Sequence, residues 1–144
     1  VACMAVGNAG GRIVAGLISD RIGRKATLAI MLGCQALLMF LGMSLIGADV
    51  SALLLVLLAT GIGFNYGTNL SLFPSFTKDL WGLRSFGTNY GLLFTAWGVG
   101  GFALSRISQM LQTSTGTFAA SFLTAGILLL GGLVLTVFGL ARKT

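Results

Sequence analysis

The 144-residue sequence contains no histidine and no glutamate, and its acidic groups are three aspartates. Asp20, Asp49 and Asp79 are far apart in the chain, and each stands at the end of an apolar run. Metal centres and acid–base catalysis need several such groups brought together at one place. The sequence therefore argues against a metal site, a cofactor or an enzymatic activity within this chain.

Cysteine and charge are also scarce. Cys3 and Cys34 lie within apolar runs without metal-like spacing, so we interpret them as small buried residues rather than as a disulfide or a metal site. Charged residues make up 8% of the chain, against roughly 25% in soluble domains. This composition excludes a soluble domain of any size. The net charge of +6 would suggest nucleic acid in a soluble protein, but here it indicates basic loops beside a membrane, and we expect no nucleic-acid partner.

Long apolar runs occupy nearly the whole sequence. Each approaches the ~20 residues that an α-helix needs to cross a bilayer, and none shows the alternation of a barrel strand. We therefore expect an all-α membrane protein with five transmembrane helices, over about residues 1–19, 26–46, 50–73, 87–111 and 117–140. Pro74, the only proline, has no N–H, so we expect the third helix to end there and residues 75–86 to form a polar connection. A neutral turn is expected at residues 112–116.

The basic residues indicate the orientation. Seven of the nine fall on the first, third and last connections, which lie on one side of the membrane: Arg21, Arg24, Lys25, Lys78, Arg84, Arg142 and Lys143. The positive-inside rule places this side in the cytoplasm, so loops 20–25 and 75–86 and the C-terminus are expected there. Arg106 is an exception near the outer end of the fourth helix, and we interpret it as a side chain that reaches the outer interface. The partner of these helices is the lipid bilayer.

Arg12 is the only charged residue in the first apolar run. It precedes the charged cluster at Asp20 by eight residues, which places it about 12 Å inside the membrane at 1.5 Å per residue. A cation at that depth costs about 2.5–3.5 kcal/mol and persists where it faces a cavity or a partner. Because guanidinium fits a carboxylate with two parallel hydrogen bonds, Arg12 is the candidate ligand for an organic anion. The alternative is a tie to the carbonyl groups of a neighbouring helix.

Further candidate binding residues lie on the third and fourth helices. Tyr90 and Trp97 are two helical turns apart and share a face with Phe94, so these rings can line a cavity or can pack in a core. Asn65 and Asn69 share a face of the third helix, with Tyr66 beside them. Buried amides need partners in a membrane, so the two asparagines either bind a ligand or join helices.

Small residues recur every four positions on three of the helices. The rows are Gly7, Gly11, Ala15 and Ser19; Ala59, Gly63 and Gly67; and Gly87 and Gly91. Such rows let helix backbones approach closely. The approach can serve static packing or sliding between helices.

The segment from Gly16 to Lys25 resembles the G-x-x-x-D-R-x-G-R-[KR] signature of the major facilitator superfamily. Its matching positions are Gly16, Asp20, Arg21, Gly23, Arg24 and Lys25. In the superfamily this signature occupies a cytoplasmic turn, where an aspartate at a helix end faces basic residues. The resemblance implies a gating latch, whereas the same charges could also act only as a topology signal.

Two further segments resemble the oxalate/formate antiporter family within that superfamily. Residues 65–74 are similar to its tenth helix and residues 89–98 to its eleventh. The resemblance implies that residues 1–144 are helices eight to twelve of a twelve-helix fold. This part of the C-terminal six-helix bundle would lack the first helix of that bundle and the N-terminal half, which would be its partner. Since the chain begins on Val1, we expect a piece of a longer protein, in a bacterial inner (plasma) membrane.

The resemblance also implies a function, which is secondary active transport of a small organic anion by alternating access. Arg12 occupies the position of an arginine that holds oxalate in the family, and Trp97 stands where the family has a second cation, a lysine. One cation balances one carboxylate, so a monocarboxylate such as formate, lactate or pyruvate is favoured over oxalate. The alternatives are a superfamily transporter for a sugar or drug and a membrane sensor that does not transport.

Overall fold

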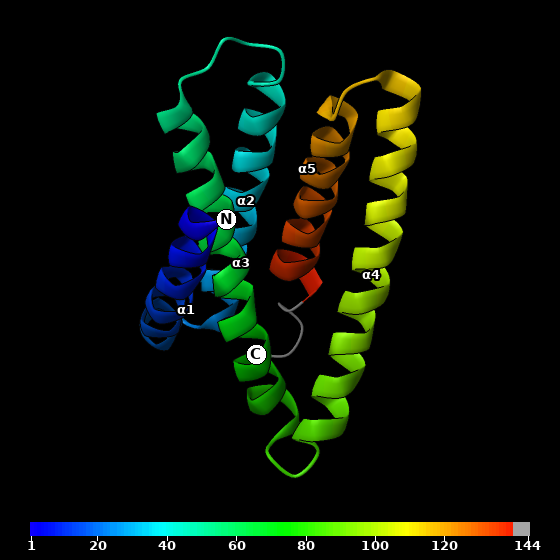
Figure 1. The fold of residues 1–144 in the computed structure, drawn as a ribbon. Helices are drawn as coiled ribbons and strands as arrows, with labels where there is room; N and C mark the ends of the chain where they lie inside the picture. Colours follow the sequence, from blue (N-terminus) through cyan, green and yellow to red (C-terminus); the bar gives the residue numbers. More distant parts are fainter. Residues whose placement is uncertain (140–144) are drawn as a thin grey trace.

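The computed structural model describes residues 1–139, which form five α-helices and contain no strand (Figure 1). The helices are α1 (Ala2–Ile22), α2 (Arg24–Ser44), α3 (Ala52–Trp81), α4 (Phe86–Thr115) and α5 (Ala119–Val134), and α5 continues into a π-helical turn, Leu135–Gly139. The expected all-α fold is confirmed. By length and composition α1, α2, α3 and α5 with its π-helical turn qualify as membrane spans. The remaining helix, α4, is 30 residues long but does not qualify as a span by these criteria.

Helices α1 and α3 pack backbone against backbone in parallel. Gly7 and Gly11 of α1 and Gly63 and Gly67 of α3 are all buried. A methyl group on any of them would meet a backbone oxygen of the other helix, such as the Phe64 carbonyl at Gly11. Two of the predicted small-residue rows therefore form one interlocked contact.

Helix α2 lies behind this pair and joins it to α5. Two aromatic rings fit against glycines at the α2–α5 contact: Phe122 against Gly42, and Phe40 against Gly126. Helix α4 lies at the edge of the bundle (Figure 1), and none of its residues is buried. Gly87 and Gly91 form the third predicted row, and a methyl group added at either would have no neighbour within 4 Å among the described residues. One broad face of α4 is therefore left uncovered by the described helices.

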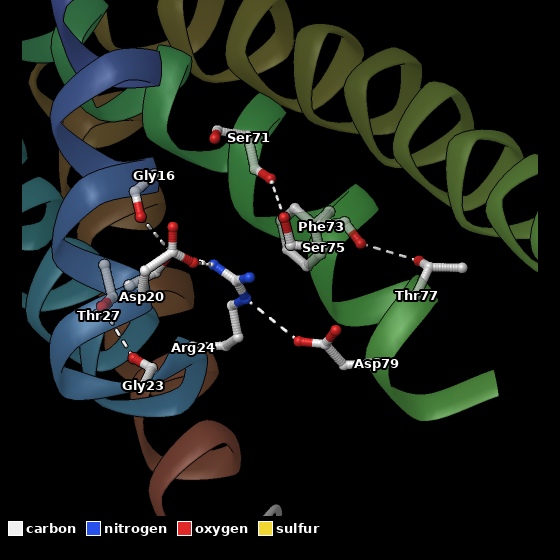
Figure 2. A network of polar contacts seen from close by, with 11 residues as sticks. Gly16, Asp20, Gly23, Arg24, Thr27, Ser71, Phe73, Ser75, Thr77 and Asp79 are labelled. Carbon is white, nitrogen blue, oxygen red and sulfur yellow. Dashed lines mark hydrogen bonds and ion pairs between the residues drawn. The ribbon is translucent and has the colours of Figure 1, made fainter. Parts of the chain in front are cut away.

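The predicted end of the third helix at Pro74 is wrong, because α3 continues through it to Trp81. Hydroxyl groups satisfy carbonyls around the proline: Ser75 donates to the Ser71 carbonyl at 3.1 Å and Thr77 to the Phe73 carbonyl at 2.8 Å (Figure 2). These bonds support the helix on either side of the proline, and proline is tolerated in membrane helices where neighbouring Ser and Thr side chains make such bonds. The expected cytoplasmic loop 75–86 therefore shrinks to residues 82–85.

Two other boundaries also differ from the sequence prediction. The first turn is a single residue, Gly23, rather than residues 20–25, because its φ of 89° reverses the chain directly between α1 and α2. The predicted turn at 112–116 is helical as far as Thr115, and α4 ends there with Gly116 as its C-cap, whose φ is 72°. The predicted C-terminal charges Arg142 and Lys143 lie outside the described residues.

Candidate functional site

The charged signature lies at the corner where α1 meets α2, and it is held together by Arg24 (Figure 2). Arg24 Nη1 lies 2.7 Å from Asp20 Oδ1 and also donates to the Ser19 hydroxyl. Behind the turn, Thr27 is fully buried and donates to the Gly23 carbonyl at 2.8 Å. These bonds fix the guanidinium against the end of α1.

Arg24 also connects this corner to α3. Its Nε donates to Asp79 Oδ2 at 3.2 Å, across 55 residues of sequence (Figure 2). The pair forms only because α3 extends past Pro74 and carries Asp79 to the level of Arg24. We call Asp20, Arg24 and Asp79 the charged corner, which joins the ends of three helices through one guanidinium.

An aromatic row runs along α4 on the side that faces α3. Phe86 stacks on Tyr90 with ring centroids 5.2 Å apart, Tyr90 meets Phe94 edge-on at 4.8 Å, and Phe94 lies 5.6 Å from Trp97. The spacings of four, four and three residues place these rings on one side of the helix. Tyr66 of α3 faces the end of the row, 6.4 Å from Trp97.

A cavity of about 300 Å³ lies between α3 and α4 beside this row. Of its nine described lining residues, none is charged and five are aromatic. The lining residues are Tyr66, Asn69, Leu70, Phe73, Tyr90, Leu93, Phe94, Ala96 and Trp97. We call it the aromatic cavity. It brings together four of the residues that the sequence marks as substrate-binding candidates, Tyr66, Asn69, Tyr90 and Trp97.

The two asparagines of α3 are placed differently. Asn65 is 4% exposed, does not line the aromatic cavity, and donates from Nδ2 to the Gly61 carbonyl of its own helix at 3.3 Å. Asn69 lines the cavity, but its Oδ1 is buried and has no hydrogen-bond partner among the described residues. Asn69 is therefore the one amide side chain in the described lining of the cavity.

Arg12 lies at the level of the aromatic cavity, although it is not one of its lining residues. The Thr68 hydroxyl lies 3.5 Å from the Gly11 carbonyl, so the residues that follow, Asn69 and Arg12, stand at equal height on the parallel pair. The Arg12 side chain is exposed, and its Nε donates to Asn8 Oδ1 at 3.0 Å. Arg12 forms no ion pair within residues 1–139, so its positive charge is not balanced by a described side chain.

Similarity to curated proteins agrees with this arrangement. The chain is 32% identical over 123 residues to the MFS transporter asaE of Aspergillus flavus, covering 85% of this chain and 27% of that protein. It is 29% identical over 101 residues to the uncharacterized MFS-type transporter YhjX of Escherichia coli, covering 69% and 24%. It is 28% identical over 119 residues to the oxalate:formate antiporter of Oxalobacter formigenes, covering 82% and 28%.

The chain belongs to the major facilitator superfamily. Superfamily membership and the four candidate spans make it an integral membrane protein. No family model matches the chain. It spans about a quarter of the length of the curated superfamily relatives that it matches.

Sequence reasoning missed Asp79 as a member of the superfamily signature's network. The residue was assigned to a loop because Pro74 suggested that α3 ends early. The available signal was its position: apart from Asp20, Asp79 is the only acid on the connections that are expected from the sequence to lie on the same side as Arg21, Arg24 and Lys25. An unpaired acid beside a basic cluster is a candidate ion-pair partner.

Proposed function

We propose that this chain forms part of a secondary active transporter that carries a small monocarboxylate across the membrane by alternating access. The observation that supports the proposal most is Arg12, an exposed cation at the level of the aromatic cavity that forms no ion pair within residues 1–139. A carboxylate meeting this guanidinium would accept paired, charge-assisted hydrogen bonds. The transporter relatives favour the same class of function.

The charge of Arg12 also suggests how loading is coupled to closure. An empty site carries an isolated cation at membrane depth, which is costly to enclose. A bound carboxylate neutralises the guanidinium, so the loaded site closes around it at lower cost. This favours exchange of one anion for another, or co-transport of the anion with a proton.

The charged corner would act as the latch of this cycle. It joins α1, α2 and α3 at the end that carries the basic connections, which we assign to the cytoplasm. Because Arg24 is shared between Asp20 and Asp79, a movement of α3 relative to α1 would separate the Arg24–Asp79 pair while Arg24–Asp20 stays intact. One conformation of the transporter would then be favoured by the closed latch.

Substitution of Arg12 tests the anion site. We expect Arg12→Gln in the intact protein to lower uptake of labelled pyruvate into proteoliposomes at least about tenfold, because a hydrogen bond to a charged group contributes about 1.5–3 kcal/mol. Arg106→Gln is the matched control, since it removes an arginine that contacts the Phe102 ring on the outer part of α4. Undiminished uptake by Arg12→Gln would remove Arg12 from the mechanism.

An uncharged solute is the second candidate, because the nine described residues lining the aromatic cavity carry no charge. A sugar or drug carrier of the same superfamily would then use Arg12 only to tie α1 internally through Asn8. In that case pyruvate would not be carried by the wild-type protein, and Arg12→Gln would leave the uptake of the true solute intact.

A further inference from the structure

The size of the aromatic cavity exceeds what a very small anion can fill. Its volume is about 300 Å³, whereas one water molecule occupies about 30 Å³ of liquid, so the cavity has room for roughly ten such units. Formate has three non-hydrogen atoms and would leave most of this space to water. A body of roughly eight to ten non-hydrogen atoms matches the space better.

The cavity also offers apolar rather than polar contacts. Five of its lining residues are aromatic and three more are aliphatic. Asn69 is the one amide in the lining, and its Oδ1 is buried and has no hydrogen-bond partner among the described residues. A solute rich in hydroxyl groups would lose its water contacts here and regain few hydrogen bonds, which is unfavourable. An apolar surface would gain from the same burial.

The rings of the wall contact one another in a continuous row. Each ring from Phe86 to Trp97 contacts the next with centroids 4.8–5.6 Å apart, and Tyr66 braces Trp97 from α3. Edge-on and offset ring pairs of this kind are favourable. Trp97 is nevertheless 55% exposed and Phe94 41% exposed, so both remain available to a ligand.

The charge needed for an anion lies outside the cavity lining, at Arg12 on α1. Since Arg12 and Asn69 stand at equal height on the α1–α3 pair, one ligand can present a charged end to α1 and an apolar end to α4. We infer that the preferred substrates are monocarboxylates with an apolar body of several carbons, held by the aromatic cavity, and that formate is a poor substrate. This inference rests on the proposed anion site at Arg12 and names the substrate class of that site.

Chain length of the acid is the variable that tests the inference. Unlabelled straight-chain monocarboxylates from one to eight carbons are added as competitors of labelled pyruvate uptake by the intact protein in proteoliposomes. Burial of one methylene group contributes about 0.8 kcal/mol, so we expect the inhibition constant to fall roughly fourfold per added carbon from acetate until the cavity is filled. Protein-free liposomes correct for passive permeation of the longer acids.

Two substitutions connect this slope to the cavity. Trp97→Ala removes a wall, and we expect the dependence on chain length to flatten to twofold per carbon or less. Trp81→Ala is the matched control, because Trp81 lies outside the lining of the aromatic cavity, and it should leave the slope unchanged. Ala96→Leu fills part of the cavity, so octanoate should weaken at least fivefold as a competitor while acetate is unaffected.

The outcomes separate the inference from the proposed function. If pyruvate is carried but the inhibition constants stay within twofold from two to six carbons, or formate competes best, the inference is overturned and the monocarboxylate transporter stands. The same holds if Trp81→Ala flattens the slope as much as Trp97→Ala does. If neither pyruvate uptake nor competition by any acid is observed, the proposed function itself fails.

Discussion

At the scale of single residues, Arg12 and Arg24 differ in the partners of their side chains. Arg24 is half-buried and forms ion pairs with two aspartates, so its charge is neutralised by contacts that join helices. Arg12 is exposed and meets only a neutral amide among the described residues, so its charge is open to an incoming anion. The two arginines are only twelve residues apart in the sequence, and it is their different partners in the fold that distinguish them.

The Arg24–Asp79 pair predicts a conformational effect with little loss of stability. Exposed ion pairs contribute about 0.2–1 kcal/mol, and Asp79 is 50% exposed, so Asp79→Asn should lower the melting temperature by only a few degrees at most. Its larger effect should be on access, because one side of the latch is released. Labelling of a cysteine placed at Ser75 from the cytoplasmic side should increase several-fold.

Asp49→Asn is the control for this prediction, because Asp49 is exposed on the connection at the opposite end of the bundle. An equal increase in labelling in both variants would contradict the latch. A loss of folded protein in Asp79→Asn would instead mean that the pair is mainly structural.

Gly23 predicts a backbone effect at the same corner. Its φ of 89° and ψ of 154° lie in a region that is essentially restricted to glycine, so Gly23→Ala should destabilise the protein by about 1–3 kcal/mol. Gly87→Ala, at a helical glycine with open space around it, should cost nothing measurable. Thermal unfolding in detergent compares the two, and equal melting temperatures would show that the one-residue turn is not under this constraint.

At the scale of helices, the contact between α1 and α3 depends on the absence of side chains. Gly67→Ala would drive a methyl group into the Asn8 carbonyl, and Gly11→Ala into the Phe64 carbonyl. Because backbone must shift, we expect each substitution to destabilise the bundle by at least about 1–3 kcal/mol and to broaden the size-exclusion peak. Gly98→Ala on α4, with no neighbour within 4 Å among the described residues, is the control. Tolerance of all three would mean that the helices are farther apart than described.

The same scale shows which features of the fold could be predicted from sequence. Apolar runs and small residues at four-residue spacing are local patterns, and they identified five helices and the packing faces of α1 and α3. Pro74 misled because a local rule for helix ends was applied to a helix that continues through the proline, where the Ser75 and Thr77 hydroxyls bond to nearby carbonyls. The Arg24–Asp79 pair and the Tyr66–Trp97 contact join distant residues, which no local pattern specifies.

At the scale of the whole molecule, the basic residues gather at one end of the bundle. Arg21, Arg24 and Lys25 at the α1–α2 corner and Arg84 beyond α3 lie at the end opposite Asp49 and Thr115, because Arg24 and Asp79 are in contact. We expect a cysteine at position 84 to react with an impermeant reagent only from the cytoplasmic side, and one at Ala48 only from outside. The reverse pattern would invert the assigned orientation.

The candidate site is a property of the assembled bundle rather than of any one helix. Arg12, Asn69 and Trp97 come from three helices, and their common level follows from the parallel α1–α3 pair and the ring contact between α3 and α4. The sequence identified these residues singly, from charge, amide and aromatic character in apolar runs. That Arg12 lies outside the apolar cavity, whereas Asn69 and Trp97 line it, could be seen only in the folded structure.

The most direct test of the account compares a carboxylate with its uncharged amide. Binding of pyruvate and of pyruvamide to the purified intact protein is measured from the rise in melting temperature with ligand concentration, which needs no transport. The account predicts that the wild-type protein binds pyruvate at least about tenfold more tightly than pyruvamide and that Arg12→Gln binds both equally. Equal affinity in the wild type, or a carboxylate preference that survives Arg12→Gln, would contradict it.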